Sequence, residues 1–107
     1  MVKVLIEPLA KEDIASIYRY IKYKLLSNQG ANNFMELIGT EISRLADSPN
    51  IGRIDERFIP KHYRYLIAKR RYRIYYVVKE DTCHVLSVWD ALQDPDKIIT
   101  KLNNEYI

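Results

Sequence analysis

The spacing of apolar residues changes once along this chain, from helical in the first half to strand-like in the second. Two stretches carry apolar side chains three or four residues apart: Ile14, Ile17, Tyr18, Ile21 and Leu25, and then Phe34, Leu37, Ile38, Ile42 and Leu45. Segments 62–68, 72–78 and 83–89 are short and rich in β-branched and aromatic residues, which is typical of strands. Two helices followed by three strands predict an α+β domain.

The residues before the first helical stretch predict one more strand. Residues 2–7 form a short apolar run that Pro8 ends. The first helix is expected to start near Lys11, with Glu12 and Asp13 in its first turn, where the helix dipole favours anions.

Turn and cap signals set the remaining boundaries. The sequence SNQG at 27–30 is predicted to end the first helix, and the second helix is expected over about 31–48. Residues 50–61 show no sustained period and predict an ordered loop. After the last strand, Asp94 is the predicted N-cap of a short C-terminal helix, with Pro95 at its first position. The predicted fold is β-α-α-β-β-β-α, an antiparallel sheet with a two-helix hairpin packed on one face and the other face open.

The size and composition of the chain indicate how many domains it forms and where it is located. With 107 residues, residues 1–107 are predicted to form a single domain. The sequence has no apolar run long enough to span a membrane and no signal-peptide pattern at its start, so a cytoplasmic location is expected. The single cysteine, Cys83, has no partner for an internal disulfide and is predicted to be a small core residue.

Positive charge is concentrated in the second half of the chain. Residues 1–50 contain six Lys or Arg and six Asp or Glu, whereas residues 57–84 contain eight Lys or Arg and two acidic residues. Such a basic region attracts nucleic acid or an acidic protein, and Lys and Arg at strand edges also prevent aggregation, so composition leaves both interpretations open. Tyr18, Tyr20 and Tyr23 fit a helix packed on a sheet better than a base-stacking platform.

The strands at 62–68 and 72–78 are expected to form a hairpin. A tight turn at Lys69 and Arg70 would place Leu66 opposite Arg73 and sort side chains by parity. One face then collects Tyr63, Tyr65, Ile67, Tyr72, Ile74, Tyr76 and Val78, which suit packing on the helices. The other face collects Arg64, Leu66, Arg73, Tyr75 and Val77. This register predicts Arg64 and Arg73 as neighbours on the uncovered face.

The turn residues leave an alternative register open. A type I′ turn favours Asn or Gly, which tolerate positive φ, and Lys69 and Arg70 do not suit it. A longer loop would shift the pairing, and an odd shift would separate Arg64 from Arg73.

Taken together, the pattern resembles the RelE/ParE superfamily of bacterial type II toxin-antitoxin toxins. The matching residues extend over roughly residues 4–99 in a consistent order: Pro8, Ala10, Asp13, Ile14, Ile17, Tyr20 and Ile21; Ile42, Leu45, Ser48, Pro49, Gly52 and Arg53; Tyr63, Arg64, Leu66, Tyr72, Arg73, Ile74, Tyr76, Val85 and Val88; Gln93, Asp94 and Pro95. The resemblance implies a growth-inhibiting toxin of a plasmid-stabilisation module, neutralised by a cognate antitoxin. It leaves open a homodimer or a hetero-oligomer with the antitoxin.

Two mechanisms divide this superfamily. RelE-like toxins cleave mRNA on the ribosome, and ParE-like toxins inhibit DNA gyrase without being nucleases. In a nuclease, the resemblance assigns catalytic roles to Arg73 and Arg64. Asp90, at the end of the last strand, is the candidate base. Candidates for contacts with the target or RNA are Lys61, Lys69, Arg70, Arg71, Tyr75, Trp89 and Gln93.

The ParE-like mechanism is slightly favoured by the segment after the last strand. Residues 89–95, WDALQDP, offer no His, Tyr or Arg where the nucleases keep a terminal catalytic group. A DxRQDP-type frame is kept, with Leu92 in place of the arginine. A third hypothesis is a non-toxic remnant that retains antitoxin binding. No metal or cofactor is expected, because ligand-spaced His, Cys and carboxylate clusters and glycine-rich phosphate loops are absent from the sequence.

Overall fold

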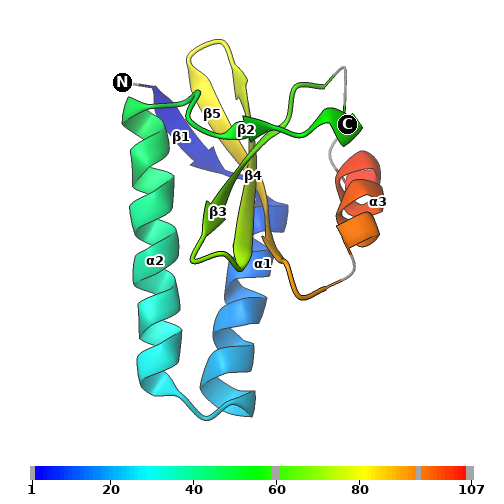
Figure 1. Ribbon diagram of the computed structural model, residues 1–107. Helices are drawn as coiled ribbons and strands as arrows, with labels where there is room; N and C mark the ends of the chain where they lie inside the picture. The colour runs from blue at the N-terminus through cyan, green and yellow to red at the C-terminus, as the bar shows by residue number, and fades with distance from the viewer. Residues whose placement is uncertain (1, 59–60, 94, 106–107) are drawn as a thin grey trace.

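The computed structural model describes residues 2–58, 61–93 and 95–105 and has the predicted α+β fold (Figure 1). The elements in order are β1 (Lys3–Ile6), α1 (Pro8–Arg19), the π-helix η1 (Tyr20–Lys24), α2 (Asn28–Asp47), β2 (Arg53–Ile54), the 3₁₀-helix η2 (Glu56–Phe58), β3 (Arg64–Ala68), β4 (Tyr72–Lys79), β5 (Thr82–Asp90) and α3 (Pro95–Glu105). The predicted loop at 50–61 therefore contains two short elements. Asp94, the predicted N-cap, lies outside the described residues.

The helix boundaries follow local caps. α1 begins directly at Pro8, whose fixed φ suits the first helical position. The Ser27 hydroxyl accepts a hydrogen bond from the Gly30 N–H at 2.8 Å, which caps the start of α2. The SNQG sequence thus marks the beginning of the second helix as well as the end of the first. None of the described helices is long and apolar enough to cross a membrane.

The five strands form one sheet in the order β1-β5-β4-β3-β2. Three neighbouring pairs are antiparallel, as expected, but β1 pairs with β5 in parallel. Nearly the whole domain separates β1 from β5 in the chain, so no hairpin sets the direction of β1. The sheet is therefore mixed.

Each face of the sheet carries its own apolar core. The face under α1 and α2 buries Ile14, Phe34, Ile38, Leu45, Tyr72, Ile74, Tyr76, Val85 and Val88. The opposite face buries Phe58, Tyr63, Tyr75, Val77, Leu86, Trp89, Ile98 and Leu102. Because Ile98 and Leu102 belong to α3, the prediction that this second face is open is wrong (Figure 1).

The β3–β4 hairpin differs from the predicted register by one residue. Lys69 and Arg70 both have positive φ, 50° and 57°, and the Arg71 N–H donates to the Ala68 carbonyl at 3.1 Å. Beyond this turn Ala68 pairs with Tyr72, so three residues rather than two separate the paired positions.

This shift reverses the side chains of β3 only. Arg64 lies opposite Tyr76, and Arg73 lies opposite Ile67. Because the side-chain period of a strand is two, a one-residue slip moves every β3 side chain to the other face. Arg64 is therefore on the helical-hairpin face and Arg73 is on the α3 face. The prediction that they are neighbours is wrong.

Candidate functional site

Arg73 is the half-buried cation at the centre of the α3 face. It lies opposite Trp89 of β5 in the sheet, and its guanidinium carbon is 4.7 Å from the centre of the Tyr65 ring. Its Nη1 also donates to the Tyr75 hydroxyl at a long 3.4 Å. Within the described residues no carboxylate forms an ion pair with Arg73, so its charge faces aromatic side chains.

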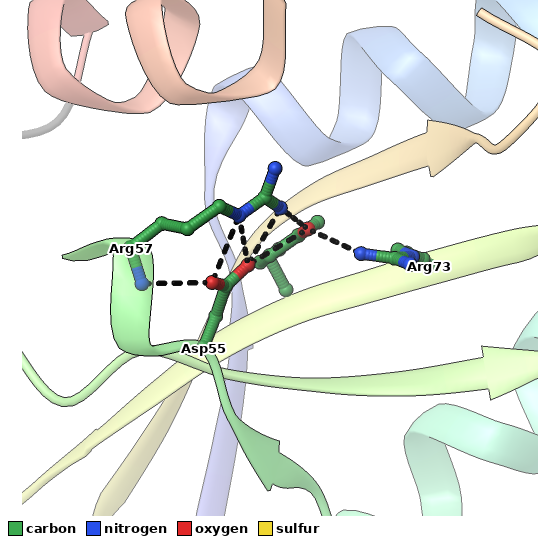
Figure 2. A network of polar contacts seen from close by, with 4 residues as sticks. Asp55, Arg57 and Arg73 are labelled. Atoms are coloured by element: carbon green, nitrogen blue, oxygen red, sulfur yellow. Dashed lines mark hydrogen bonds and ion pairs between the residues drawn. The ribbon is translucent and has the colours of Figure 1, made fainter. Parts of the chain in front are cut away.

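A polar network adjoins Arg73 on the side of the β2–η2 segment (Figure 2). Asp55 is 6% exposed, and the Arg57 guanidinium donates two hydrogen bonds to its carboxylate, from Nη2 to Oδ2 at 2.8 Å and from Nε to Oδ1 at 3.0 Å. The Arg57 backbone N–H donates to the same Oδ1 at 3.0 Å. The Tyr75 hydroxyl lies between the two arginines, 3.2 Å from Arg57 Nη2 and 3.3 Å from Asp55 Oδ2. Tyr75 therefore connects the Asp55–Arg57 pair to Arg73.

The pKa shifts in this network fix its charge state. Burial acts to raise the pKa of Asp55, but the hydrogen bonds from Arg57 outweigh it and hold that pKa below its ordinary value. The hydrogen bonds to Asp55 raise the pKa of Arg57, and burial raises the pKa of Tyr75. Near neutral pH the Asp55–Arg57 pair is therefore a carboxylate and a guanidinium, and Tyr75 is a neutral phenol.

Four of the predicted site residues meet around one small cavity. Its volume is about 40 Å³, and it is lined by Arg57, Arg73, Tyr75, Trp89, Ala91, Gln93 and Ile98. The cavity has room for a water molecule or one small polar group. The buried Trp89 indole N–H has no hydrogen-bond partner among the described residues, and Lys101 Nζ of α3 lies 5.6 Å from the centre of a Trp89 ring.

Asp55 and Arg57 are not among the predicted site residues, because both lie in the predicted loop at 50–61. The signal available was the Asp-x-Arg spacing, which allows the Asp side chain to accept from the backbone N–H two residues on. Tyr75 is 18 to 20 residues away in the chain, so no local pattern indicates the three-way contact.

Arg64 has a structural role on the other face. Its Nη1 donates to the carbonyls of Gly52 at 2.8 Å and Asn50 at 3.3 Å. The Gly52 N–H donates to the Tyr76 hydroxyl at 2.8 Å, and a Cβ at Gly52 would approach that oxygen to 2.5 Å. Arg64 and Tyr76 therefore anchor the segment between α2 and β2.

Asp90 and Arg71 form an ion pair at the end of β5. Arg71 Nη2 and Nε lie 3.0 and 3.3 Å from the two Asp90 oxygens, and the Leu92 N–H donates to Asp90 Oδ1 at 3.0 Å. The hydrogen bonds to Asp90 raise the pKa of Arg71. Asp90, the candidate base, is thus occupied by an arginine and a turn N–H.

The remaining cationic candidates lie outside the Arg73 network. Lys69 and Arg70 are exposed in the β3–β4 turn. Lys61 Nζ lies 5.9 Å from the centre of the Tyr63 ring. Among the described residues no group of three or more His, Cys, Asp or Glu is placed to hold a metal ion. Cys83 is buried, as predicted.

The fold of this protein is shared with a protein of known structure. A solved structure described as "Chromosomal ParDE TA system from P. aeruginosa" matches with a TM-score of 0.73 and 22% identity, covering 84% of this chain and 96% of that chain. This likeness shows the shared fold. A comparison with curated proteins gives no match.

The sequence comparison then gives the family. Residues 4–95 match the family described as ParE toxin of type II toxin-antitoxin system, parDE. The chain therefore belongs to the ParE toxin family, within the RelE/ParE superfamily that the sequence resembles. It is the toxin component of a type II system, and its partner is a cognate antitoxin.

Proposed function

We propose that this toxin arrests growth by inhibiting DNA gyrase rather than by cleaving mRNA. Membership of the ParE family supports this proposal. The observation that carries it is the dispersal of the candidate nuclease residues, since Arg64 lies on the face opposite Arg73.

Cleavage of RNA without a metal needs a base for the 2′-hydroxyl, an acid for the leaving oxygen and cations for the phosphate. Asp90 is held by Arg71, and Asp55 is held by Arg57 with a pKa below its ordinary value. A carboxylate that already accepts hydrogen bonds from an arginine is a poor proton acceptor. Arg73 is thus a cation without an available base beside it in the described part of the chain.

A second candidate function is a ribosome-dependent, metal-independent endoribonuclease. It is supported by the cavity between Arg57 and Arg73, where two guanidinium groups and the Tyr75 hydroxyl converge. Such groups suit a phosphate oxygen. In this mechanism Asp55 would act as the base only after leaving Arg57.

Induced expression of the chain without antitoxin, with pulse labelling of DNA and protein synthesis, separates the two functions. The proposal predicts that DNA synthesis falls first and that the purified chain inhibits gyrase supercoiling. An early block of protein synthesis with cleaved ribosome-bound mRNA, abolished by Arg73→Ala, would establish the nuclease instead. Normal growth at full expression would contradict both functions and support the hypothesis of a non-toxic remnant that retains antitoxin binding.

A further inference from the structure

The connection between α1 and α2 exposes a cluster of large apolar side chains. Tyr20, Tyr23, Leu25 and Leu26 are 51%, 63%, 54% and 84% exposed and occur within residues 20–26. They are four of the ten exposed large apolar side chains in the described part of the chain. Such a concentration at one place marks an interaction surface more often than scattered exposed residues do. It also corrects the prediction that Tyr20 and Tyr23 pack on the sheet.

The backbone of this connection departs from α-helical geometry. Residues Tyr20–Lys24 form a π-helix, in which the Leu25 N–H donates to the Tyr20 carbonyl at 3.1 Å. The added residue in this turn rotates Leu25 away from the apolar stripe that Ile21 continues, which is why Leu25 is exposed despite its predicted place in the core. Leu26 then takes a positive φ of 53°, an uncommon conformation for a residue with a branched side chain. Both features occur preferentially at functional sites.

Cations surround these apolar side chains. Residues 18–26 include Arg19, Lys22 and Lys24 and no acidic residue. Lys22 Nζ lies 5.6 and 5.4 Å from the ring centres of Tyr18 and Tyr23, so its charge is held over the aromatic cluster.

A groove joins this connection to the β3–β4 turn. Its volume is about 330 Å³, and it is lined by Ile21, Gly30, Asn33, Phe34, Leu37, Lys69, Arg71 and Tyr72. Figure 1 shows the β3–β4 turn beside the middle of α2, with the α1–α2 connection further along in the direction in which the turn points. Lys69 and Arg70 occupy turn positions with positive φ, where Asn or Gly would be less strained. The sequence therefore keeps cations beside this groove at a local conformational cost.

We infer that the surface formed by residues 19–26, residues 69–71 and the groove between them, here called the hairpin end, docks on an acidic protein surface. Because this inference rests on the proposed function, that surface is assigned to gyrase. An apolar and aromatic centre with a cationic rim matches the composition of protein interfaces, and the cations require carboxylates on the partner.

Two other kinds of partner fit less well. A nucleic-acid backbone would be neutralised by the cations but would leave Leu25 and Leu26 without apolar contacts. A lipid surface would accept Leu25 and Leu26, but the groove between Ile21 and Lys69 would then lie unfilled beside the bilayer. A protein side chain fills that groove.

The test uses two pairs of variants of the full chain in a gyrase supercoiling assay and in direct binding to immobilised gyrase. Tyr23→Ser/Leu26→Ser removes exposed apolar surface, and Lys22→Glu/Lys24→Glu reverses two charges. Leu92→Ser and Lys79→Glu/Lys97→Glu are the matched controls, because they change similarly exposed residues elsewhere. Thermal melting of each variant establishes that it is folded.

The inference predicts that both hairpin-end variants inhibit and bind at least about tenfold more weakly, while the controls stay within about twofold of the original chain. Equal inhibition by all variants would overturn the inference and leave the gyrase proposal standing. Absence of inhibition by the original chain would overturn both.

Two further probes test the kind of partner. The first probe is a 30-base-pair DNA duplex, and the second is vesicles of phosphatidylglycerol and phosphatidylcholine. We expect the hairpin-end variants to bind each probe no more weakly than their matched controls do. Specific loss of DNA or vesicle binding, with gyrase inhibition retained, would show that the hairpin end serves another partner.

Discussion

Asp13 provides the sharpest test of how α3 is held on the sheet. Its carboxylate is 7% exposed and accepts hydrogen bonds from Ser87 Oγ at 2.5 Å, the Val88 N–H at 3.0 Å and Lys101 Nζ at 2.6 Å. These contacts link α1, β5 and α3 across 74 to 88 residues of chain. Asp13→Ala removes all of them at once.

The expected loss of unfolding free energy in Asp13→Ala follows from the burial of the three donors. Ser87 is fully buried, and the Val88 N–H donates to Asp13, so each donor left without an acceptor costs about 1–3 kcal/mol. The Lys101 side chain is 30% exposed, so its ion pair adds at most about 1 kcal/mol after solvent screening. We therefore expect Asp13→Ala to lower the free energy of unfolding by about 3–5 kcal/mol.

Urea denaturation followed by circular dichroism measures this loss, and two variants calibrate it. Asp13→Asn keeps an acceptor for the Val88 N–H, so it should lower the free energy of unfolding by roughly half as much as Asp13→Ala does. Glu12→Ala breaks an ion pair with Arg19 whose side chains are 68% and 56% exposed, so it should change the stability by less than about 0.5 kcal/mol. A loss below about 1 kcal/mol for Asp13→Ala would refute the reasoning, since it would mean that water or another acceptor replaces the carboxylate.

Three further predictions follow from the contacts around the sheet. Arg64→Ala should lower the free energy of unfolding by about 1–3 kcal/mol by releasing the Gly52 carbonyl, while gyrase inhibition by the folded fraction stays unchanged; reduced inhibition at equal folded protein would contradict its structural role. Because the pKa of Asp55 is lowered in the fold, its stabilising effect is complete above the ordinary value of 3.8 and is lost as the pH falls through the folded value. Denaturation series between about pH 5 and pH 2 should accordingly show a shallower loss of stability for Asp55→Asn than for the original chain, and parallel curves would argue against the Arg57 pair. Burial raises the pKa of Cys83 to about 11, so a thiol reagent at pH 8 should label it only after unfolding; rapid labelling of the native chain would show that this strand opens readily.

The elements that were predictable from sequence are those with sustained periodicity. The helical stripe of α2 and the alternation in β4 are long enough that one face is unambiguously apolar, and Tyr72, Ile74 and Tyr76 lie on the predicted face. Asp13 shows the limit of local reasoning. The sequence pattern predicts Asp13 in the first helical turn, near the positive end of the helix dipole. In the structure α1 begins at Pro8, and the Asp13 carboxylate binds residues more than 70 positions away in the chain.

The register of β3 could not be settled by the same reasoning. Lys69 and Arg70 do not suit the usual turn preferences, so these preferences do not favour three intervening residues over two. Both faces of β3 carry apolar or aromatic residues, with Leu66 on one and Tyr65 and Ile67 on the other. A strand that is apolar on both sides specifies its register weakly, and one residue of slip was sufficient to separate Arg64 from Arg73.

The basic region between residues 57 and 84 therefore serves at least three separate purposes. Arg64 binds backbone carbonyls, Arg71 pairs with Asp90, and Arg73 faces aromatic rings. The role of one of these arginines therefore does not indicate the role of the others. Lys69 and Arg70 lie in the turn without an ion pair among the described residues. Net charge along the chain cannot distinguish these cases, because a cation already paired within the fold contributes little to the recognition of a partner. The exposed turn cations remain available for binding, and Lys69 lines the groove at the hairpin end.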